Sequence, residues 1–270
     1  MSRTASNEPM LLEVRAPFAI ITFNTPEKKN AMDTTLYKKL SSLLQQVDKI
    51  DAVKITVLTG KGDFFSAGAD VKAAREAFPG EEARISSLKR LTEGNMDLGR
   101  AFYKHSKILV AGLNGPAIGL SAALLGHVDF IYAVENAYFL TPFSAIGLVC
   151  EGGASLTLPR RMGIAKANEA LIMGKKLSAT ELHQCGFING VFPKSSDDEF
   201  RKALLAHLEQ QFDGLDLEAC LISKQLIRAN EPDPDTNNIR EIFAGAERFA
   251  TGKPQAQFAK LASKQMRHKL

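Results

Sequence analysis

The sequence predicts an α/β fold, and the order of its hydrophobic patterns is the main reason. Apolar residues from Leu36 to Val47 recur at helical spacing, and a β-rich apolar run follows at residues 53–58. A second apolar run, Ile108–Leu113, has the character of a buried strand and leads, through Asn114-Gly115-Pro116, into a helix start at residues 120–125. Strand, helix and strand in this order favour right-handed crossover connections and the α/β class.

Local signals place the other elements of the first 193 residues. Asp33 is a favoured N-cap, so the first helix is expected to begin there and to end near Asp48. Ser178 and Glu181 form a capping-box pattern at a later helix start. Short apolar runs bounded by turn residues predict strands at 11–15, 19–23, 130–134, 137–140 and 191–192. Helical patterns predict helices after Glu151 and at 165–173.

Two longer helical stretches set the domain organisation. Residues 71–104 have a helical pattern that is broken near Pro79-Gly80. Its charged part, 77–95, fits either a flap over a site or a solvated helix. From Ser195 the pattern is helical to the end of the chain. We therefore expect an α/β core over residues 1–193 and a helical C-terminal region over 194–270.

Composition and charge exclude several classes of protein. The 270 residues are 45% apolar and 24% charged, as in ordinary soluble globular proteins. The net charge of +4 is too small, and the basic residues too scattered, to indicate a nucleic-acid-binding protein. Three cysteines without metal-ligand spacing are typical of reduced thiols in an intracellular protein. No apolar run has the length of a membrane span, and the N-terminus lacks a signal-peptide core.

Two loops have the same strand, small-residue turn and helix pattern. One is the stretch from Phe64 to Asp70, which follows a β-rich run, and the other centres on Gly119. Such a loop aims free backbone N–H groups and the positive end of a helix at one point, which suits negative charge on a ligand oxygen. Both loops together could hold one oxyanion. The alternative is that Gly and Ala simply pack closely where helix meets sheet.

Glu151 is the candidate acid or base. Its neighbours from Gly147 to Gly153 are apolar or glycine apart from Cys150, so its carboxylate is expected to be partly desolvated. Desolvation would raise its pKa and suit it to proton transfer. The alternative is a glutamate that only stabilises the start of the following helix.

Four motifs resemble those of the crotonase superfamily, also called the enoyl-CoA hydratase/isomerase family. They are Lys29-Asn30-Ala31-Met32, the loop 64–70, the stretch 114–121 and Gly147-Leu148 with the helix that follows. The similarity covers roughly residues 10–250 and is greatest to the isomerase branch, through His105-Ser106-Lys107 and Glu151-Gly152-Gly153. The resemblance implies a core of repeated β-β-α turns and a C-terminal helical region that forms trimers.

The resemblance also implies roles for particular residues. It assigns the backbone N–H groups of Ala69 and Leu120 to an oxyanion hole for a thioester carbonyl, and Glu151 to the catalytic acid/base. Hydratases of the family use two glutamates, at positions that Ala123 and Phe143 occupy here. The expected reaction is therefore isomerisation of 3-enoyl-CoA to trans-2-enoyl-CoA, in the oxidation of unsaturated fatty acids, by a 1,3-proton shift. It needs no metal or other cofactor, because coenzyme A is part of the substrate.

The acyl-CoA is expected to lie along the motif loops. Phe143 and Leu148 are assigned to the acyl pocket. Lys29, Lys260 and Lys264 either contact the coenzyme A phosphates or are plain surface residues. Asp70 also lies in a motif, but it is expected to cap a helix, as Asn114 is expected to bond a turn. The candidate substrate-binding residues are Lys29, Ala31, Ala67, Gly68, Ala69, Asp70, Gly119, Leu120, Phe143, Leu148, Lys260 and Lys264.

Other readings remain open within the family. They are a dienoyl-CoA isomerase, which would want further acids in the acyl pocket, a weak hydratase, and a non-catalytic acyl-CoA-binding member. The chain lacks a dinucleotide fingerprint, a P-loop and a Gly-x-Ser-x-Gly elbow. A trimer or a hexamer of two trimers is expected. The final His-Lys-Leu is a near match to the peroxisomal Ser-Lys-Leu address, which favours an import receptor as partner and the peroxisome over cytoplasm or mitochondrion.

Overall fold

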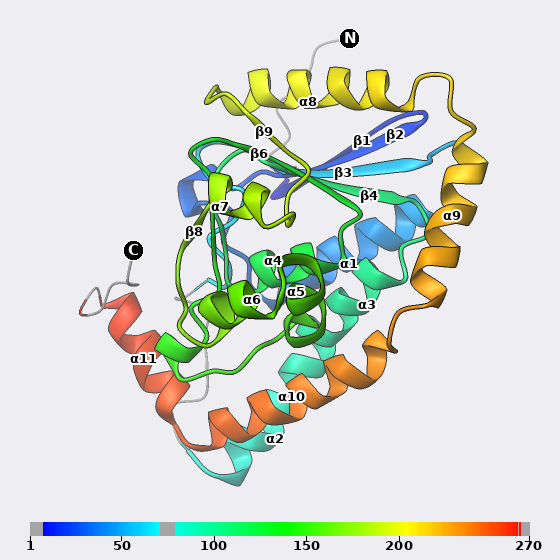
Figure 1. Ribbon diagram of the computed structural model, residues 1–270. Coiled ribbons are helices and arrows are strands. Elements are labelled where there is room, and N and C mark those ends of the chain that lie inside the picture. The colour runs from blue at the N-terminus through cyan, green and yellow to red at the C-terminus, as the bar shows by residue number, and fades with distance from the viewer. Residues whose placement is uncertain (1–7, 71–78, 264, 266–270) are drawn as a thin grey trace.

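A six-stranded sheet forms the centre of the computed structural model, which describes residues 8–70, 79–263 and 265 (Figure 1). Its strand order is β1-β2-β3-β4-β6-β9. The first pair is antiparallel and the other neighbours are parallel. The strands are β1 Met10–Arg15, β2 Phe18–Phe23, β3 Ile55–Gly60, β4 Ile108–Leu113, β6 Phe130–Val134 and β9 Gly190–Phe192.

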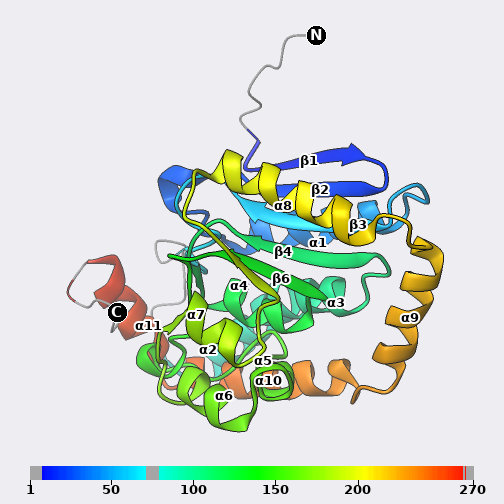
Figure 2. The same ribbon diagram turned by 45° about the horizontal axis from the view of Figure 1, so that its top comes forward.

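The central parallel strands are largely apolar because both faces of the sheet are covered there. All residues of β3 and β4 are buried. On one face lie α1 (Thr34–Asp48) and α3 (Asp97–Tyr103), and on the other lies α8 (Asp197–Phe212) (Figure 2). A Cβ at Gly112 of β4 would meet the side chain of Leu204 of α8 at 2.4 Å, so glycine allows this helix its close approach.

A second, three-stranded sheet lies beside the first and carries the turn that begins α4. Its order is β5-β7-β8, with β5 Ala117–Ile118, β7 Tyr138–Leu140 and β8 Leu177–Ser178. Short helices surround it, because the chain here alternates small apolar residues with glycine turns. They are α4 Leu120–Ala123, α5 Ala154–Met162, α6 Ile164–Leu171 and α7 Ala179–Gln184.

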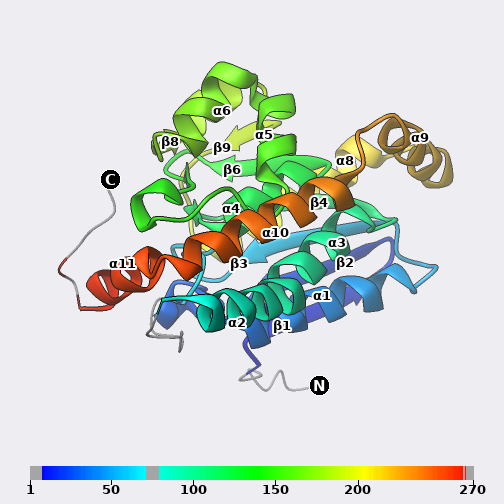
Figure 3. The ribbon, with the colours of Figure 1, turned by 90° about the horizontal axis from the view of Figure 1, so that it is seen from below.

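Three helices close the chain. The helix α9 (Leu217–Ala229) stands at the edge of the molecule, between α8 and α10 (Pro234–Ala250). Figure 3 shows α10 lying along α2 (Glu81–Leu91), with α11 (Lys253–Ala262) beyond it. Between α2 and α3 the chain forms one turn of π-helix, Thr92–Met96. In the described part of the chain, no helix is long and apolar enough to cross a membrane.

The structure confirms the predicted α/β class and most of the predicted elements. Residues 11–15 and 19–23 form a hairpin, Asp33 caps α1 by accepting from the Leu36 N–H, and Ser178 and Glu181 form the expected capping box. Within the charged part 77–95, residues 81–91 form α2 and residues 92–95 lie in the π-helical turn, Pro79 and Gly80 are not helical, and residues 77–78 lie outside the described residues. Its role as a flap over a site stays a prediction. The helix predicted directly after Asp70 lies outside the described residues, and the boundary at residue 193 stays a prediction.

Candidate active site

The loop 66–70 lies between two other segments and bonds to both. On one side, Met32 donates to the Gly68 carbonyl at 2.8 Å and accepts from the Asp70 N–H at 2.9 Å. On the other side, the Ile118 N–H donates to the Ser66 carbonyl at 2.9 Å. When two residues of one parallel segment bond to the same residue of its partner, the residue between them points its own N–H away from that partner. The N–H of Ala69 therefore faces away from Met32, toward the loop that contains Gly119.

The two predicted loops are in close contact at their glycines. Gly68 has a φ of +82°, and a Cβ there would meet the Ile118 carbonyl oxygen at 2.5 Å. Gly119 has a φ of +66° and turns the chain from β5 into α4, whose first residue is Leu120. Position 68 favours glycine because of its positive φ and this close contact, and position 119 because of its positive φ. The two predicted loops thus lie against each other, and their role as an oxyanion hole stays a prediction.

Two backbone N–H groups are available where the loops meet. Leu120 opens α4, and the first N–H groups of a helix have no partner inside it. Among the described residues, no carbonyl or side chain accepts a hydrogen bond from the N–H of Ala69 or of Leu120. Two such donors suit an oxygen that gains negative charge.

Buried amides support the loops from behind. Asn114 accepts from the Gly60 N–H at 2.9 Å and donates to the carbonyls of Gly62 and Phe64 at 2.7 and 3.1 Å. This agrees with its predicted role in bonding the turn. Asn30, in a left-handed conformation, donates to the carbonyls of Lys61 and Phe64 at 3.0 and 2.8 Å. Two side chains thus fix the turn that leads into Ala69.

Glu151 lies on the loop before α5, next to the oxyanion loop. The following residue, Gly152, lies against Leu120, since a Cβ there would meet Leu120 Cδ1 at 2.8 Å. The loop begins after Phe143, whose carbonyl accepts from the Leu148 N–H at 2.8 Å. Glu151 is half-buried, as expected for a carboxylate among apolar residues. Glu151, the predicted base, is therefore next to a residue that lies against Leu120, which carries one of the two N–H donors.

Asn95 reaches the base from a different element and was not predicted from the sequence. Its Nδ2 donates to Glu151 Oε2 at 2.8 Å. Asn95 is 8% exposed and belongs to the π-helix between α2 and α3. Single π-helical turns occur frequently at functional sites. The one signal in the sequence is a small polar residue inside an otherwise charged helical stretch, which is too common to indicate a site.

The turn after the base packs on a buried histidine. His127 Nε2 lies 2.9 Å from the Gly152 carbonyl oxygen. Burial lowers the pKa of His127 to about 4, with the charges of Arg228 and Arg161 acting in the same direction. The ring is therefore neutral at pH 7, and its Nε2–H is the group that can donate to this carbonyl. Burial also raises the pKa of the neighbouring Cys150 thiol to about 11, which keeps it from acting as a thiolate.

The remaining predicted residues lie in three places. Ala31 and Ala67 are half-buried in the paired loops, where the Ala67 N–H donates to the Lys29 carbonyl at 2.9 Å. Phe143 is buried at 2% exposure, and Leu148 is half-buried. Lys29 and Lys260 are exposed, with Lys29 Nζ 4.9 Å from the centre of the Phe64 ring. Lys264 lies outside the described residues. The assignments of these residues to substrate stay predictions.

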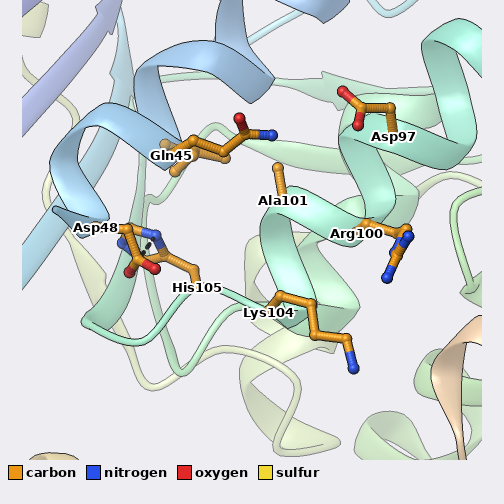
Figure 4. A pocket seen from close by; sticks show the side chains of 8 residues that line it. Gln45, Asp48, Asp97, Arg100, Ala101, Lys104 and His105 are labelled. Atoms are coloured by element: carbon orange, nitrogen blue, oxygen red, sulfur yellow. Dashed lines mark ion pairs between the residues drawn. The ribbon is translucent and has the colours of Figure 1, made fainter.

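Two cavities lie away from these loops. Figure 4 shows the smaller, about 230 Å³, which lies between α1 and α3. There the ring of His105 is buried, its Nδ1 is 3.3 Å from Asp48 Oδ1, and burial lowers its pKa to about 4. The larger cavity, about 1090 Å³, lies between α9 and the body of the molecule. Neither is lined by a residue predicted for the site.

Comparison with known proteins adds independent information. A family model described as enoyl-CoA hydratase/isomerase matches residues 13–238. A protein of Pyricularia oryzae named Delta(3,5)-Delta(2,4)-dienoyl-CoA isomerase is 45% identical, over 96% of this chain and 98% of its own length. The 3,2-trans-enoyl-CoA isomerase of Saccharomyces cerevisiae is 34% identical, over 98% of both chains. A crystal structure of an enoyl-CoA hydratase/isomerase from Pseudoalteromonas atlantica superposes with a TM-score of 0.81 at 28% identity, over 97% of this chain and all of that one.

Proposed function

The chain belongs to the enoyl-CoA hydratase/isomerase family, and from that premise we propose that it isomerises 3-enoyl-CoA to trans-2-enoyl-CoA. The observation that carries this proposal is the Glu151 carboxylate beside two loops whose N–H groups, at Ala69 and Leu120, have no acceptor among the described residues. The two relatives described above are both named as isomerases of unsaturated acyl-CoA, which supports the reaction class.

The proposed reaction is a 1,3-proton shift. Glu151 removes a proton from C2 of the 3-enoyl thioester, and the electron pair moves into the carbonyl to form a dienolate. The N–H groups of Ala69 and Leu120 hold the dienolate oxygen. The same carboxyl group, now protonated, returns its proton to C4, and the double bond ends between C2 and C3. One base and one oxyanion hole are sufficient, so we propose that no metal or other cofactor takes part.

Hydration is disfavoured by the residues at the two positions where the hydratases have glutamates. Ala123 is fully buried and Phe143 is 2% exposed. Neither can hold a water molecule for attack on a 2-enoyl thioester. The proton shift needs neither position, since Glu151 serves as both base and acid.

The second candidate function is isomerisation of 3,5-dienoyl-CoA to 2,4-dienoyl-CoA. It is favoured by the name of the relative that is 45% identical over nearly the whole chain. In that reaction the proton leaves C2 and is returned at C6, so a single base must span a longer path or a second acid must help. One of the positions predicted for the acyl pocket holds the buried, apolar Phe143 and not a further acid, which supports the shorter shift.

The coenzyme A part of the substrate is proposed to lie along the paired loops. Lys29 is exposed at the edge of these loops, and Lys260 is exposed on α11. Both, together with Lys264, are proposed to meet the phosphates. Ala31, Ala67 and Gly68 leave space for the pantetheine, while Phe143 and Leu148 line the acyl end.

A homotrimer, or a hexamer of two trimers, is proposed as the assembly. Several large apolar side chains on α9 are exposed in the single chain, as at a surface that another subunit covers. They are Ile222 at 56%, Leu226 at 64% and Ile227 at 67%. The peroxisome is the proposed location, through recognition of the final His-Lys-Leu by an import receptor.

One assay separates these functions. Purified protein is given trans-3-hexenoyl-CoA, a 3,5-dienoyl-CoA and trans-2-hexenoyl-CoA, in parallel with Glu151→Gln and with the exposed control Glu247→Gln. We expect turnover of the first substrate, little hydration of the third, and loss of turnover only in Glu151→Gln. Faster turnover of the dienoyl substrate would select the second candidate. Binding without turnover of any substrate would contradict both.

A further inference from the structure

Glu241 of α10 has a buried carboxylate. It accepts hydrogen bonds from Gly153 and Ser155, the two residues on either side of Ala154 at the start of α5. Its Oε2 accepts from the Gly153 N–H at 2.7 Å. Its Oε1 accepts from the N–H and the hydroxyl of Ser155 at 2.9 and 2.6 Å. Glu241 is 6% exposed, and burial raises its pKa while these hydrogen bonds lower it. A buried carboxylate is thus placed where it fixes the segment that follows Glu151.

Contacts from other elements are needed to fix the Gly152-Gly153 turn, because its own residues provide neither a restricted backbone nor a side-chain cap. Gly152 and Gly153 have φ values of +69° and +79°, two successive left-handed residues between the base and α5. Gly153 is the N-cap of α5 and has no side chain to cap it. The carboxylate from α10 takes the place of that cap and brings negative charge to the helix N-terminus. On the other side of the turn, His127 contacts the Gly152 carbonyl.

The same helix also holds the other end of the base loop. Arg248 lies two helical turns after Glu241, and its Nε donates to the Gly147 carbonyl at 2.8 Å. Asn238, one turn before Glu241, donates through Nδ2 to the Met96 carbonyl at 3.3 Å, next to Asn95. One helix therefore bonds both ends of the loop Gly147–Gly153 and the segment that carries the hydrogen-bond donor of the base.

We propose that Glu241 is a positioning residue for proton transfer: by fixing the Gly152-Gly153 turn, it holds the Glu151 carboxylate where it can reach both C2 and C4 of the acyl chain. This inference rests on the proposed function of Glu151. A displacement of the base on the order of 1 Å is enough to slow such a step about 100-fold. Substrate binding makes no use of Glu241, because its carboxylate is buried behind the turn.

The test is Glu241→Gln, which keeps the shape of the side chain but presents an NH₂ group to one of the donors on the turn. Glu247→Gln, on the exposed face of α10, is the control. We expect kcat per binding-competent site to fall about 10- to 100-fold. The Kd for a saturated acyl-CoA should stay within about threefold of the wild-type value, and exchange of the C2 proton in D₂O should slow together with kcat.

A capping role alone predicts a different result. In that case Glu241→Gln lowers the melting temperature and the number of binding-competent sites, while kcat per site stays within about twofold of wild type. That result would overturn the inference. If Glu241→Gln does not fold, Ser155→Ala replaces it, since Ser155 is exposed and its hydroxyl is one of the donors to Glu241. A fall of about threefold in kcat at unchanged Kd is expected for it, and an unchanged kcat would overturn the inference.

Glu151→Gln is measured in the same series, so that the two proposals can fail separately. If Glu151→Gln is inactive while Glu241→Gln is fully active per site, Glu151 is the base but Glu241 does not position it. If Glu151→Gln is fully active, Glu151 is not the base and the positioning role falls with it, whereas absence of turnover in the wild type would show that the proposed function itself is wrong.

Discussion

Asn95 Nδ2 donates a 2.8 Å hydrogen bond to Glu151 Oε2 and joins two residues that are 56 positions apart in the chain. The bond links the π-helix before α3 to the loop before α5. It leaves one carboxylate oxygen, Oε1, outside this contact. A base that takes a proton from one carbon and returns it to another gains from a fixed orientation, and this bond contributes to it.

Replacing Asn95 by Ala should lower kcat by about 10- to 100-fold, because a hydrogen bond to a charged group is lost and the carboxylate can rotate. Ligand affinity should change little. The measurement is steady-state turnover of a 3-enoyl-CoA together with the Kd of a saturated acyl-CoA. Asn230→Ala is the control, since that exposed amide donates to the Leu226 carbonyl at the end of α9. Equal turnover in the two variants would argue against any role of Asn95 at the base.

The oxyanion loops should not tolerate a methyl group at Gly68. A Cβ there lies 2.5 Å from the Ile118 carbonyl oxygen, so Gly68→Ala must push the two loops apart. Loss of one oxyanion donor typically costs about 10²- to 10³-fold in rate, and we expect kcat to fall by that amount. Gly186→Ala is a matched control, because Gly186 has a similar φ of +77° but no atom within 4 Å of the added Cβ. If both variants lose stability equally and keep full activity, the loops do not form the site.

The local chemistry of single residues was enough to predict much of the fold. Asp33 begins α1, and Ser178 with Glu181 begins α7, because a cap is a contact between residues three positions apart. The contact between the loops that contain Gly68 and Gly119 could be predicted for a related reason. Glycine at positions 68 and 119 reports a backbone constraint that is present in the sequence itself.

The supports of the base could not be predicted, because they are contacts between distant elements. Asn95 and Glu241 reach the base loop across 56 and 88 positions of chain. The π-helical turn that aims Asn95 inward depends on how α2 and α3 pack, not on a local pattern. His127 lies outside the four motifs, and its sequence neighbours do not indicate that it contacts Gly152. Tertiary packing decides these positions.

The buried His127 should make the protein less stable in acid. Its pKa is about 4 in the folded chain, below the ordinary 6.5 of an exposed histidine. Between these values the unfolded chain binds a proton that the folded chain does not, so the free energy of unfolding falls as the pH drops from about 6.5 toward 4. For one such histidine, the loss is on the order of 3 kcal/mol.

His127→Gln should remove this part of the pH dependence while keeping a donor for the Gly152 carbonyl. We expect the wild type to lose about 2 kcal/mol more than the variant between pH 7 and pH 4.5, measured by urea unfolding at both values. The pH-sensitive contribution of His105, whose pKa is also lowered to about 4, remains in both proteins and cancels. Parallel pH profiles for the two proteins would show that His127 is not the group responsible.

Asp129 should be the main anchor that holds α9 against the sheet. Its carboxylate accepts from Lys224 Nζ at 2.7 Å and from Arg228 Nη2 at 2.9 Å, and the three side chains are 11–24% exposed. Asp129→Ala leaves the Lys224 ammonium buried without its counter-charge, and removing one partner of a buried pair typically costs about 3–5 kcal/mol. The melting temperature at fixed protein concentration should fall by roughly 10 °C.

Asp198→Ala, which removes an exposed pair with Arg201 at 3.7 Å, is the control and should change the free energy of unfolding by less than about 1 kcal/mol. In the Asp129 variant, amide hydrogen exchange should be faster in α9 than in α1. Equal protection of the two helices in that variant would show that α9 is held by its other contacts.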